Sequence, residues 1–246
     1  MKTDNILGVN IAVTDMDEVV SDILSDLDGK RGKYICVSNV HTVVMAHDDK
    51  SFMDIQNGAL MALPDGMPLS AHSRKAGYAE AERVTGPDLM KRLLIISGRN
   101  MSQGRRLRHF FYGSDRETID KLAQVIADRY PEAEIAGMIS PPYRELTCSE
   151  DEEHIRLINE ASPDFIWVGL GAPKQERWMS QHKDKVSGLM IGVGAAFDYE
   201  AGNIKRAPVW MQKCSLEWLY RLMQDPGRLF KRYFVTNLKY MWLTRK

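Results

Sequence analysis

The clearest indication of the fold is the stretch Phe165-Ile166-Trp167-Val168-Gly169-Leu170-Gly171-Ala172-Pro173-Lys174-Gln175-Glu176, in which apolar residues run into two glycines and then into polar residues. A continuous apolar run of this length is typical of a strand buried on both faces, as in a parallel sheet. The glycines allow the chain to turn closely after the strand, and the polar residues that follow favour a helix start. The stretch therefore predicts one strand–loop–helix unit of an α/β fold.

Similar apolar runs recur on both sides of this stretch, separated by helical patterns and turn signals. The predicted strands span residues 6–13, 34–37, 59–63, 109–112, 134–138, 165–169 and 189–193. The predicted helices run from a cap at Thr14 to about residue 28, from Gly86 onward, from a cap at Ser114 to about residue 129, and from about residue 149 to before Pro163. We expect a Rossmann-like, mostly parallel sheet flanked by helices.

Composition narrows the class of protein. The chain has 246 residues, 33 Lys and Arg against 33 Asp and Glu, and 44% hydrophobic residues, which excludes a disordered chain. No run approaches the roughly 20 apolar residues of a membrane-spanning helix, and the first residues lack a signal-peptide pattern, so we expect a cytoplasmic protein. Three widely separated cysteines favour neither a disulfide framework nor a zinc site.

The C-terminal segment differs from the rest of the chain. Residues 201–246 contain ten Lys and Arg against two Asp and Glu, and eight of the 21 aromatic residues. We expect residues 1–200 to form the catalytic body, with a weak boundary near 97–107, and residues 201–246 to form a helical appendage. Two alternatives remain: a solvated basic face packed on the body, or helices lying on an anionic membrane surface. Nucleic-acid binding is disfavoured, because no recognised module is present.

Polar residues follow two of the predicted strands, where parallel sheets usually place their sites. Asp65 stands on a stiff turn between Pro64 and Gly66, and this rigidity favours it as a general base, although a lone Asp before Gly is more often turn chemistry. Ser38 and Asn39 follow another strand and could contact a ligand or cap a helix.

Two glycine pairs follow later strands, Gly169 with Gly171 and Gly192 with Gly194, and could let backbone amides approach a phosphate. Neither completes the GxGxxG pattern of dinucleotide-binding enzymes, and there is no P-loop pattern. The Asp15-Met16-Asp17 sequence resembles a metal-binding DxD, but acids at this position are more typical of a capped helix start.

Seven blocks of sequence together resemble the WecG/TagA/CpsF glycosyltransferases in order and spacing across nearly the whole chain. The blocks are Leu63-Pro64-Asp65-Gly66-Met67-Pro68, Arg83-Val84-Thr85-Gly86-Pro87-Asp88-Leu89, Phe111-Tyr112-Gly113, residues 169–176, residues 192–194, residues 202–208, and Leu216-Glu217-Trp218-Leu219-Tyr220-Arg221-Leu222. The resemblance implies an inverting, metal-independent transfer of a sugar from a UDP donor to an undecaprenyl-diphosphate-linked sugar, without a cofactor. It also implies a protein peripheral on the inner face of the cell membrane, working in cell-wall or surface polysaccharide synthesis.

The resemblance also assigns residues. Asp65 matches the proposed general base, Arg83 a basic residue near the diphosphate, and Asn39 an active-site Asn; Val37 replaces a Thr, with Ser38 beside it. The residues expected around the donor are Ser38, Gly113, Tyr143, Gly169, Gly171, Lys174, Gln175, Glu176, Gly192, Gly194 and Asp198. The basic residues expected at the lipid diphosphate and headgroups are Arg206, Arg221, Arg228 and Arg232.

Three questions stay open at this level. A non-catalytic nucleotide- or nucleic-acid-binding protein is the alternative function, using the glycine loops and the basic tail only to hold an anion. The donor sugar depends on the shape of a pocket that the motifs do not encode. Association into a homo-oligomer is equally undecided.

Overall fold

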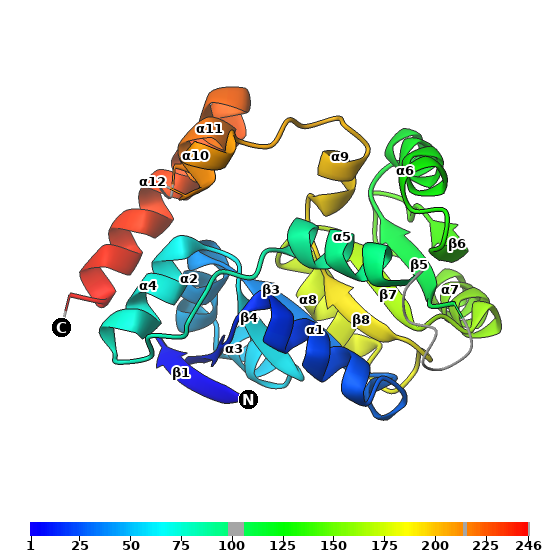
Figure 1. Ribbon diagram of the computed structural model, residues 1–246, viewed down its shortest axis with the longest axis horizontal. Helices are drawn as coiled ribbons and strands as arrows, with labels where there is room; N and C mark the ends of the chain where they lie inside the picture. Colours follow the sequence, from blue (N-terminus) through cyan, green and yellow to red (C-terminus); the bar gives the residue numbers. More distant parts are fainter. Residues whose placement is uncertain (98–105, 214–215, 246) are drawn as a thin grey trace.

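A computed structural model describes residues 1–97, 106–213 and 216–245 and contains one eight-stranded sheet (Figure 1). The strand order is β1-β2-β4-β3-β8-β7-β5-β6. Their bounds are β1 Lys2–Ile6, β2 Val9–Val13, β3 Tyr34–Ser38, β4 Met61–Pro64, β5 Arg108–Gly113, β6 Glu134–Ile139, β7 Phe165–Gly169 and β8 Leu189–Gly192. All neighbouring pairs are parallel except β1 and β2. The predicted α/β class and mostly parallel sheet are confirmed.

The prediction of one strand over residues 6–13 is wrong, because this segment contains the turn of an antiparallel hairpin. Leu7 has φ 53° and Gly8 has φ 96°, so the chain reverses between β1 and β2. The side chain of Asn5 accepts a hydrogen bond from the Gly8 N–H at 3.1 Å and so stabilises the turn. Because the turn residue Leu7 is apolar, the hydrophobic pattern continues through the turn and gives no sign of it.

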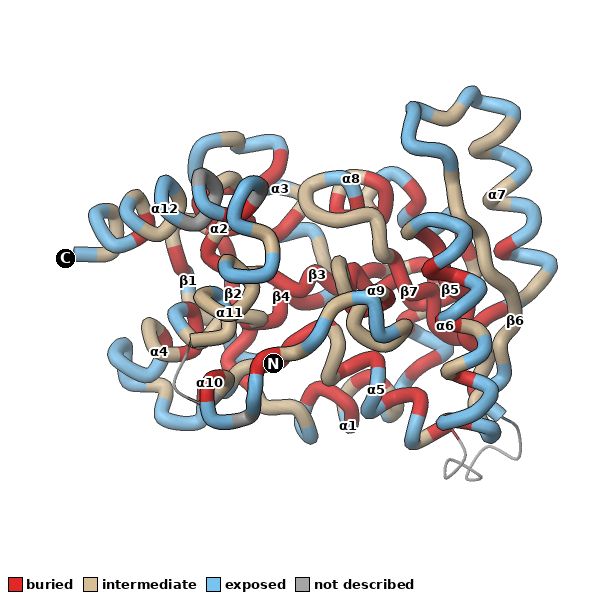
Figure 2. The backbone as a smooth tube through the Cα atoms, turned by 90° about the horizontal axis from the view of Figure 1, so that it is seen from above, coloured by how far each residue is buried: buried red, intermediate tan, exposed pale blue. Residues whose placement is uncertain are grey.

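Helices cover both faces of the sheet, as Figure 2 shows from above. The helices on one face are α1 Met16–Ser25, α5 Gly86–Ser97, α6 Arg116–Arg129 and α9 Ala196–Glu200, and those on the other are α2 Val40–Asp48, α3 Lys50–Asn57, α7 Cys148–Ala161 and α8 Lys174–Gln181. Successive strand residues alternate between the two cores: Ile35 and Val37 pack on the first face, Tyr34 and Cys36 on the second. This alternation explains why the strands read as continuous apolar runs.

Two helix caps lie one residue later than predicted. Asp15 rather than Thr14 accepts a hydrogen bond from the Glu18 N–H, and Asp115 rather than Ser114 accepts one from the Thr118 N–H. In both places two good capping residues are adjacent, so the local sequence does not distinguish them. The cap at Asp15 supports the helix-start interpretation of the Asp15-Met16-Asp17 sequence.

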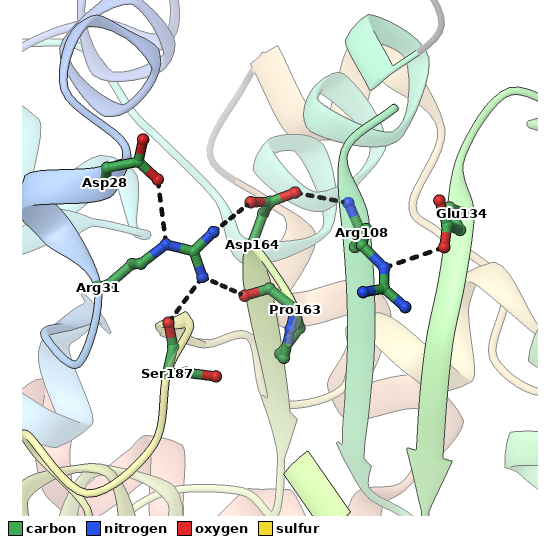
Figure 3. Close-up of polar contacts among 7 residues, drawn as sticks. All are labelled: Asp28, Arg31, Arg108, Glu134, Pro163, Asp164 and Ser187. Carbon is green, nitrogen blue, oxygen red and sulfur yellow. Dashed lines mark hydrogen bonds and ion pairs between the residues drawn. The ribbon is translucent and has the colours of Figure 1, made fainter. Parts of the chain in front are cut away.

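An ionic cluster around the buried Asp164 lies at the amino-terminal edge of the sheet (Figure 3). Asp164 is fully buried just before β7 and accepts hydrogen bonds from the Arg31 guanidinium and from the Arg108 N–H, both at 2.9 Å. Arg31 also donates to the carbonyl oxygens of Pro163 and Ser187. The cluster therefore ties the entrance of β3, which follows Arg31, to the starts of β5, β7 and β8.

The remaining helices are α4 Met67–Lys75, α10 Val209–Lys213, α11 Glu217–Gln224 and α12 Pro226–Leu243, with a 3-10 turn at Asp28–Lys30. From α11 the chain descends through α12 beside α2 (Figure 1). Tyr240 of α12 is buried there, and Lys239 pairs with Asp48 at 2.6 Å. Among the described residues, no helix combines the length and apolarity required to cross a membrane.

The predicted division at residue 200 and the weaker boundary near 97–107 stay predictions. Most of the second segment, residues 98–105, lies outside the described part of the chain. The single sheet includes strands from both sides of it.

Candidate functional site

The carboxyl ends of five strands meet at one edge of the sheet and bring most of the predicted site residues together. The register places Ser38 beside Pro64, Val168 beside Gly192, and Gly113 beside Gly169. Strands β4 and β8 flank β3, so at a spacing of about 4.8 Å per strand their ends lie about 10 Å apart. Asp65 and the two glycine loops therefore belong to one edge.

Asp65 follows β4 directly and is held by the end of β3. Its N–H donates to the carbonyl oxygen of Ser38 at 2.8 Å, and its carboxylate accepts a hydrogen bond from the Asn39 side chain. The Asn39 side-chain oxygen accepts from the N–H groups of His41 and Thr42 and caps α2. Since only the amide nitrogen of Asn can donate, Asn39 both caps the helix and orients the Asp65 carboxylate. The capping interpretation of Asn39 is confirmed, and its contact with a ligand stays a prediction.

The environment of Asp65 suits a base. The pKa of Asp65 is raised to about 6: burial and the negative charge of Glu217 raise it, while Arg83, the Asn39 hydrogen bond and Arg221 lower it. A carboxylate with this pKa is ionised near neutral pH and is more basic than an exposed one. The side chain is partly buried rather than closed off from solvent.

Arg83 reaches this edge through the segment that precedes α5. The Val84 N–H donates to the carbonyl oxygen of Pro64 at 2.9 Å, which fixes Arg83 next to the end of β4. The Arg83 guanidinium pairs with the carboxylate of Glu217 from α11 at 2.7 Å, and both side chains are mostly buried. The C-terminal helices thus contribute a carboxylate directly to the site.

A second acid–arginine pair lies beside the first. Arg206 donates from both terminal nitrogens to Asp88 in the first turn of α5, and Thr85 donates to the same carboxylate at 2.6 Å. Burial works to raise the pKa of Asp88, but the hydrogen bonds from Arg206 and Thr85 outweigh it and lower the pKa. The guanidinium groups of Arg206 and Arg221 lie 5.9 and 5.3 Å from the ring centre of Tyr199. Both arginines are thereby held near the edge.

Close packing fixes the glycine loops. A Cβ on Gly113 would lie 2.5 Å from the carbonyl carbon of Gly169, and one on Gly86 would lie 3.0 Å from the Cα of Val193. Gly171 and Gly194 have φ of 75° and 56°, values that disfavour other residues. The loops after β7 and β8 therefore depend on glycine for both space and backbone geometry.

This geometry coincides with a family match over almost the whole chain. The profile described as Glycosyl transferase WecG/TagA/CpsF family matches residues 4–246. The chain belongs to this glycosyltransferase family. The resemblance seen in the sequence blocks is confirmed, and the protein is an enzyme of the glycosyltransferase class.

Relatives of this glycosyltransferase carry a common name, N-acetylglucosaminyldiphosphoundecaprenol N-acetyl-beta-D-mannosaminyltransferase. The one from Bacillus subtilis strain 168 is 31% identical over 219 residues, covering 87% of this chain and 82% of the relative. The one from Staphylococcus aureus strain MW2 is 30% identical over 228 residues, covering 92% and 86%. The one from Bacillus spizizenii is 28% identical over 230 residues, covering 93% and 86%.

Some predicted donor residues of the glycosyltransferase lie beneath the loops. The Ser38 hydroxyl is buried and donates to the side chain of Gln56 at 2.6 Å. Gln175 and Glu176 are also buried and bond to each other at 3.0 Å. Their contact with a donor stays a prediction, and the contacts seen here are inside the protein.

Other predicted residues lie around the edge. Lys174 is exposed at the start of α8, and Asp198 in α9 bonds to Asn203. Tyr143 is 87% exposed in the segment after β6, and within the described part of the chain no hydrogen bond or ring contact joins it to Asp65. The side chains of Arg228 and Arg232 lie outside the described residues, although their backbone belongs to α12.

Sequence reasoning gave no role to three residues that pair with arginines at this edge: Asp88, Tyr199 and Glu217. Asp88 and Glu217 stand in the quoted blocks, each in a block that also contains an arginine. An acid and an arginine in each of two separate blocks could have indicated an ion pair between the blocks, such as the one between Arg83 and Glu217. Among the described residues, no three His, Cys, Asp or Glu side chains form a group able to hold a metal ion.

Proposed function

We propose that this glycosyltransferase moves an N-acetylmannosaminyl-type sugar from a UDP donor to an undecaprenyl-diphosphate-linked sugar, with inversion and without a metal ion. The observation that carries the proposal is Asp65, which stands at the same sheet edge as the glycine loops, is oriented by Asn39, and has a pKa raised to about 6. The names of the relatives support the acceptor class and the sugar.

In this mechanism Asp65 accepts the proton of the acceptor hydroxyl as the oxygen attacks the anomeric carbon of the donor sugar. The bond from that carbon to UDP breaks on the opposite side, which inverts the configuration. Asn39 keeps the carboxylate in one orientation, so that little reorganisation is needed when the proton moves.

The departing UDP carries the developing negative charge, and fixed donors must stabilise it. The backbone of the loops after β7 and β8 and the guanidinium of Arg83 are the groups that we assign to this task. Because Arg83 pairs with Glu217 in this structure, a diphosphate at Arg83 would replace that carboxylate or share the guanidinium with it.

We also propose that the C-terminal helices hold the enzyme on an anionic membrane surface. Nine large apolar side chains in the described part of this region are more than two-fifths exposed: Trp210, Trp218, Met223, Phe230, Phe234, Val235, Leu238, Met241 and Trp242. Leu229 and Tyr240 of α12 are buried instead, so the helix has one face against the body and one toward solvent. An exposed apolar face with aromatic and basic residues is typical of an interfacial helix.

A transfer assay tests the reaction. UDP-N-acetylmannosamine and other UDP-sugars are each offered with a short-chain lipid-diphosphate sugar, and released UDP is measured for wild type, Asp65→Asn and the control Asp54→Asn on α3. We expect Asp65→Asn to lose about 100- to 10,000-fold in turnover while still binding UDP. Wild-type turnover should fall as the pH drops through about 6, where Asp65 becomes protonated. Undiminished turnover by Asp65→Asn rejects the base, and UDP binding by wild type without transfer from any UDP-sugar rejects the proposed transfer.

Vesicle sedimentation tests the membrane proposal. The double variant Phe234→Ser/Trp242→Ser removes two exposed side chains of α12, and Leu157→Ser removes an exposed apolar side chain from α7 as a control. We expect the double variant alone to bind vesicles rich in anionic lipid less than wild type does. Equal sedimentation of all three proteins contradicts the proposal.

A further inference from the structure

Glu176 is a fully buried acid to which the proposed reaction assigns no chemical role. It is the third residue of α8, directly after the loop that contains Gly169 and Gly171. One carboxylate oxygen accepts a hydrogen bond from the Gln175 side chain at 3.0 Å, and the other has no hydrogen-bond partner among the described residues. A buried carboxylate with one free oxygen requires an explanation.

The Gln175 side chain connects Glu176 to the other glycine loop. Its oxygen accepts a hydrogen bond from the Gly194 N–H at 3.0 Å, and its backbone N–H donates to the carbonyl oxygen of Gly171 at 3.0 Å. Because a backbone N–H can only donate, the amide oxygen of Gln175 must face Gly194 and its nitrogen must face Glu176. That nitrogen needs an acceptor, which Glu176 provides.

The contact between α8 and the loop after β8 is direct. A Cβ on Gly192 would lie 3.0 Å from the side-chain nitrogen of Gln175 and 2.7 Å from the end of Met179. No side chain other than hydrogen fits at Gly192 without displacing these groups. The two glycine loops are therefore joined through Gln175, whose orientation Glu176 fixes.

We propose that Glu176 is a positioning residue of the donor site, acting through Gln175 to hold the Gly192–Gly194 loop against the Gly169–Gly171 loop. The inference rests on the proposed function, which places the donor diphosphate at these loops. Glu176 acts as the neutral acid: the proton resides on the free oxygen while the other oxygen continues to accept from Gln175. Ionisation keeps the hydrogen bond but places a buried negative charge below the loops.

The surroundings of Glu176 agree with a neutral group. Burial raises its pKa to about 7, against the lowering effect of its own backbone N–H and of Gln175. The helix α8 packs on β3, which presents the Cys36 thiol, and burial raises the pKa of that thiol, so it adds no charge beside Glu176. The charged groups facing α8 are Asp49, the N-cap of α3, which pairs with Arg177, and Asp151 of α7, which pairs with His182, the C-cap of α8.

UDP binding measured by calorimetry between about pH 6 and about pH 8.5 tests the inference. The variants are Glu176→Gln, which keeps an acceptor oxygen but cannot ionise, and Glu176→Leu, which removes the acceptor. Glu152→Gln on α7 is the surface control. Since the terminal phosphate of UDP also titrates near about pH 6, each variant is compared with wild type at the same pH.

We expect Glu176→Gln to match wild type below about pH 7 and to bind UDP up to about tenfold more tightly than wild type above it. Glu176→Leu should bind roughly tenfold more weakly than wild type at the lower pH, the scale of one lost hydrogen bond, and its Gly194 N–H should exchange faster with solvent deuterium. The inference is overturned if Glu176→Gln follows wild type at every pH, or if Glu176→Leu retains both affinity and Gly194 protection.

These outcomes differ from those that test the proposed function. If wild type does not bind UDP, the proposed donor is wrong. The positioning role is still tested by comparing hydrogen exchange at the Gly194 N–H in Glu176→Gln and in Glu176→Leu. If Asp65→Asn turns over normally, the base assignment fails, while the UDP measurements on the Glu176 variants keep their meaning.

Discussion

Both edges of the sheet carry an aspartate near arginine side chains, but the two aspartates have different surroundings. Asp164 stands just before β7 at the amino-terminal edge, and Asp65 stands just after β4 at the carboxyl-terminal edge. Asp164 is fully buried, and each of its oxygens accepts a hydrogen bond. Asp65 is only partly buried, and its neighbour Arg83 pairs with Glu217. A carboxylate whose bonds are all satisfied stabilises the fold, whereas one left short of positive partners stays basic.

The largest difference between the edges should appear when each aspartate becomes asparagine. Asp164→Asn removes the fully buried carboxylate that pairs with Arg31, whose side chain is 29% exposed and still pairs with Asp28, and we expect a loss of about 3 kcal/mol in the free energy of unfolding. Asp65→Asn should cost no stability near pH 8, because a carboxyl whose pKa is raised on folding destabilises the folded state once it ionises. Urea unfolding at that pH measures both variants.

The same comparison can fail in a recognisable way. If Asp164→Asn unfolds like wild type, the ionic cluster is not a source of stability. If Asp65→Asn is destabilised as strongly as Asp164→Asn, the carboxyl edge is not the less satisfied of the two.

The contributions of the two edges to folding stability should also depend on pH in opposite directions. Ionisation of Asp65 weakens the carboxyl-terminal edge as the pH rises, whereas protonation of His109 weakens the amino-terminal edge as the pH falls. His109, next to Arg108 in β5, is buried between the Ser97 hydroxyl at 2.7 Å and the Trp167 indole nitrogen at 3.0 Å. Burial lowers its pKa to about 3, with Asp164 acting in the opposite sense. Since the unfolded chain takes up the proton first, the stability that depends on neutral His109 is complete above about pH 6.5 and is lost as the pH falls toward about 3.

The variant His109→Phe isolates this effect. It leaves the buried Trp167 N–H without its acceptor, while the Ser97 hydroxyl keeps its bond to the Leu93 carbonyl oxygen, and we expect a loss of about 1–3 kcal/mol at pH 8. The difference from wild type should shrink below pH 6, because wild type itself is weakened there. Thermal or urea unfolding across this pH range is the measurement, and a difference that grows on acidification would contradict the assignment of a neutral histidine.

The buried strands of the sheet are largely predictable from sequence, but the contacts that distinguish its two edges are not. Parallel strands buried on both faces leave continuous apolar runs, so six of the strands were predicted within a residue or two, and Asp65 and Asn39 were located because they directly follow two of them. The hairpin at Leu7 was missed because an apolar residue occupies the turn. The Arg83–Glu217 pair joins residues 134 positions apart, and no local pattern encodes such a contact.

Glu217 sharpens the functional side of the comparison. Its negative charge helps to raise the pKa of Asp65, and its removal also frees Arg83 to act on Asp65 in the lowering direction. We expect Glu217→Gln to move the acidic limb of the turnover profile to lower pH and to reduce maximal turnover by roughly tenfold, because a less basic carboxylate is a weaker base. Glu82→Gln, an exposed acid near Arg83 in sequence, is the control. If the acidic limb of the Glu217→Gln profile does not shift, Glu217 does not control the pKa of the group whose protonation limits turnover.

The smallest effect on the free energy of unfolding is expected at an ion pair that is exposed to solvent. Lys239 of α12 pairs with Asp48 of α2 at 2.6 Å, yet their side chains are 37% and 50% exposed. Lys239→Met should change the free energy of unfolding by less than about 1 kcal/mol, and high salt should abolish the difference, since water screens exposed charges. Tyr240→Ala, which removes the buried neighbour that holds α12 on the body, should cost about 3 kcal/mol or more. If Lys239→Met proves as costly as Asp164→Asn, charge rather than burial and full pairing would account for the strength of the amino-terminal edge.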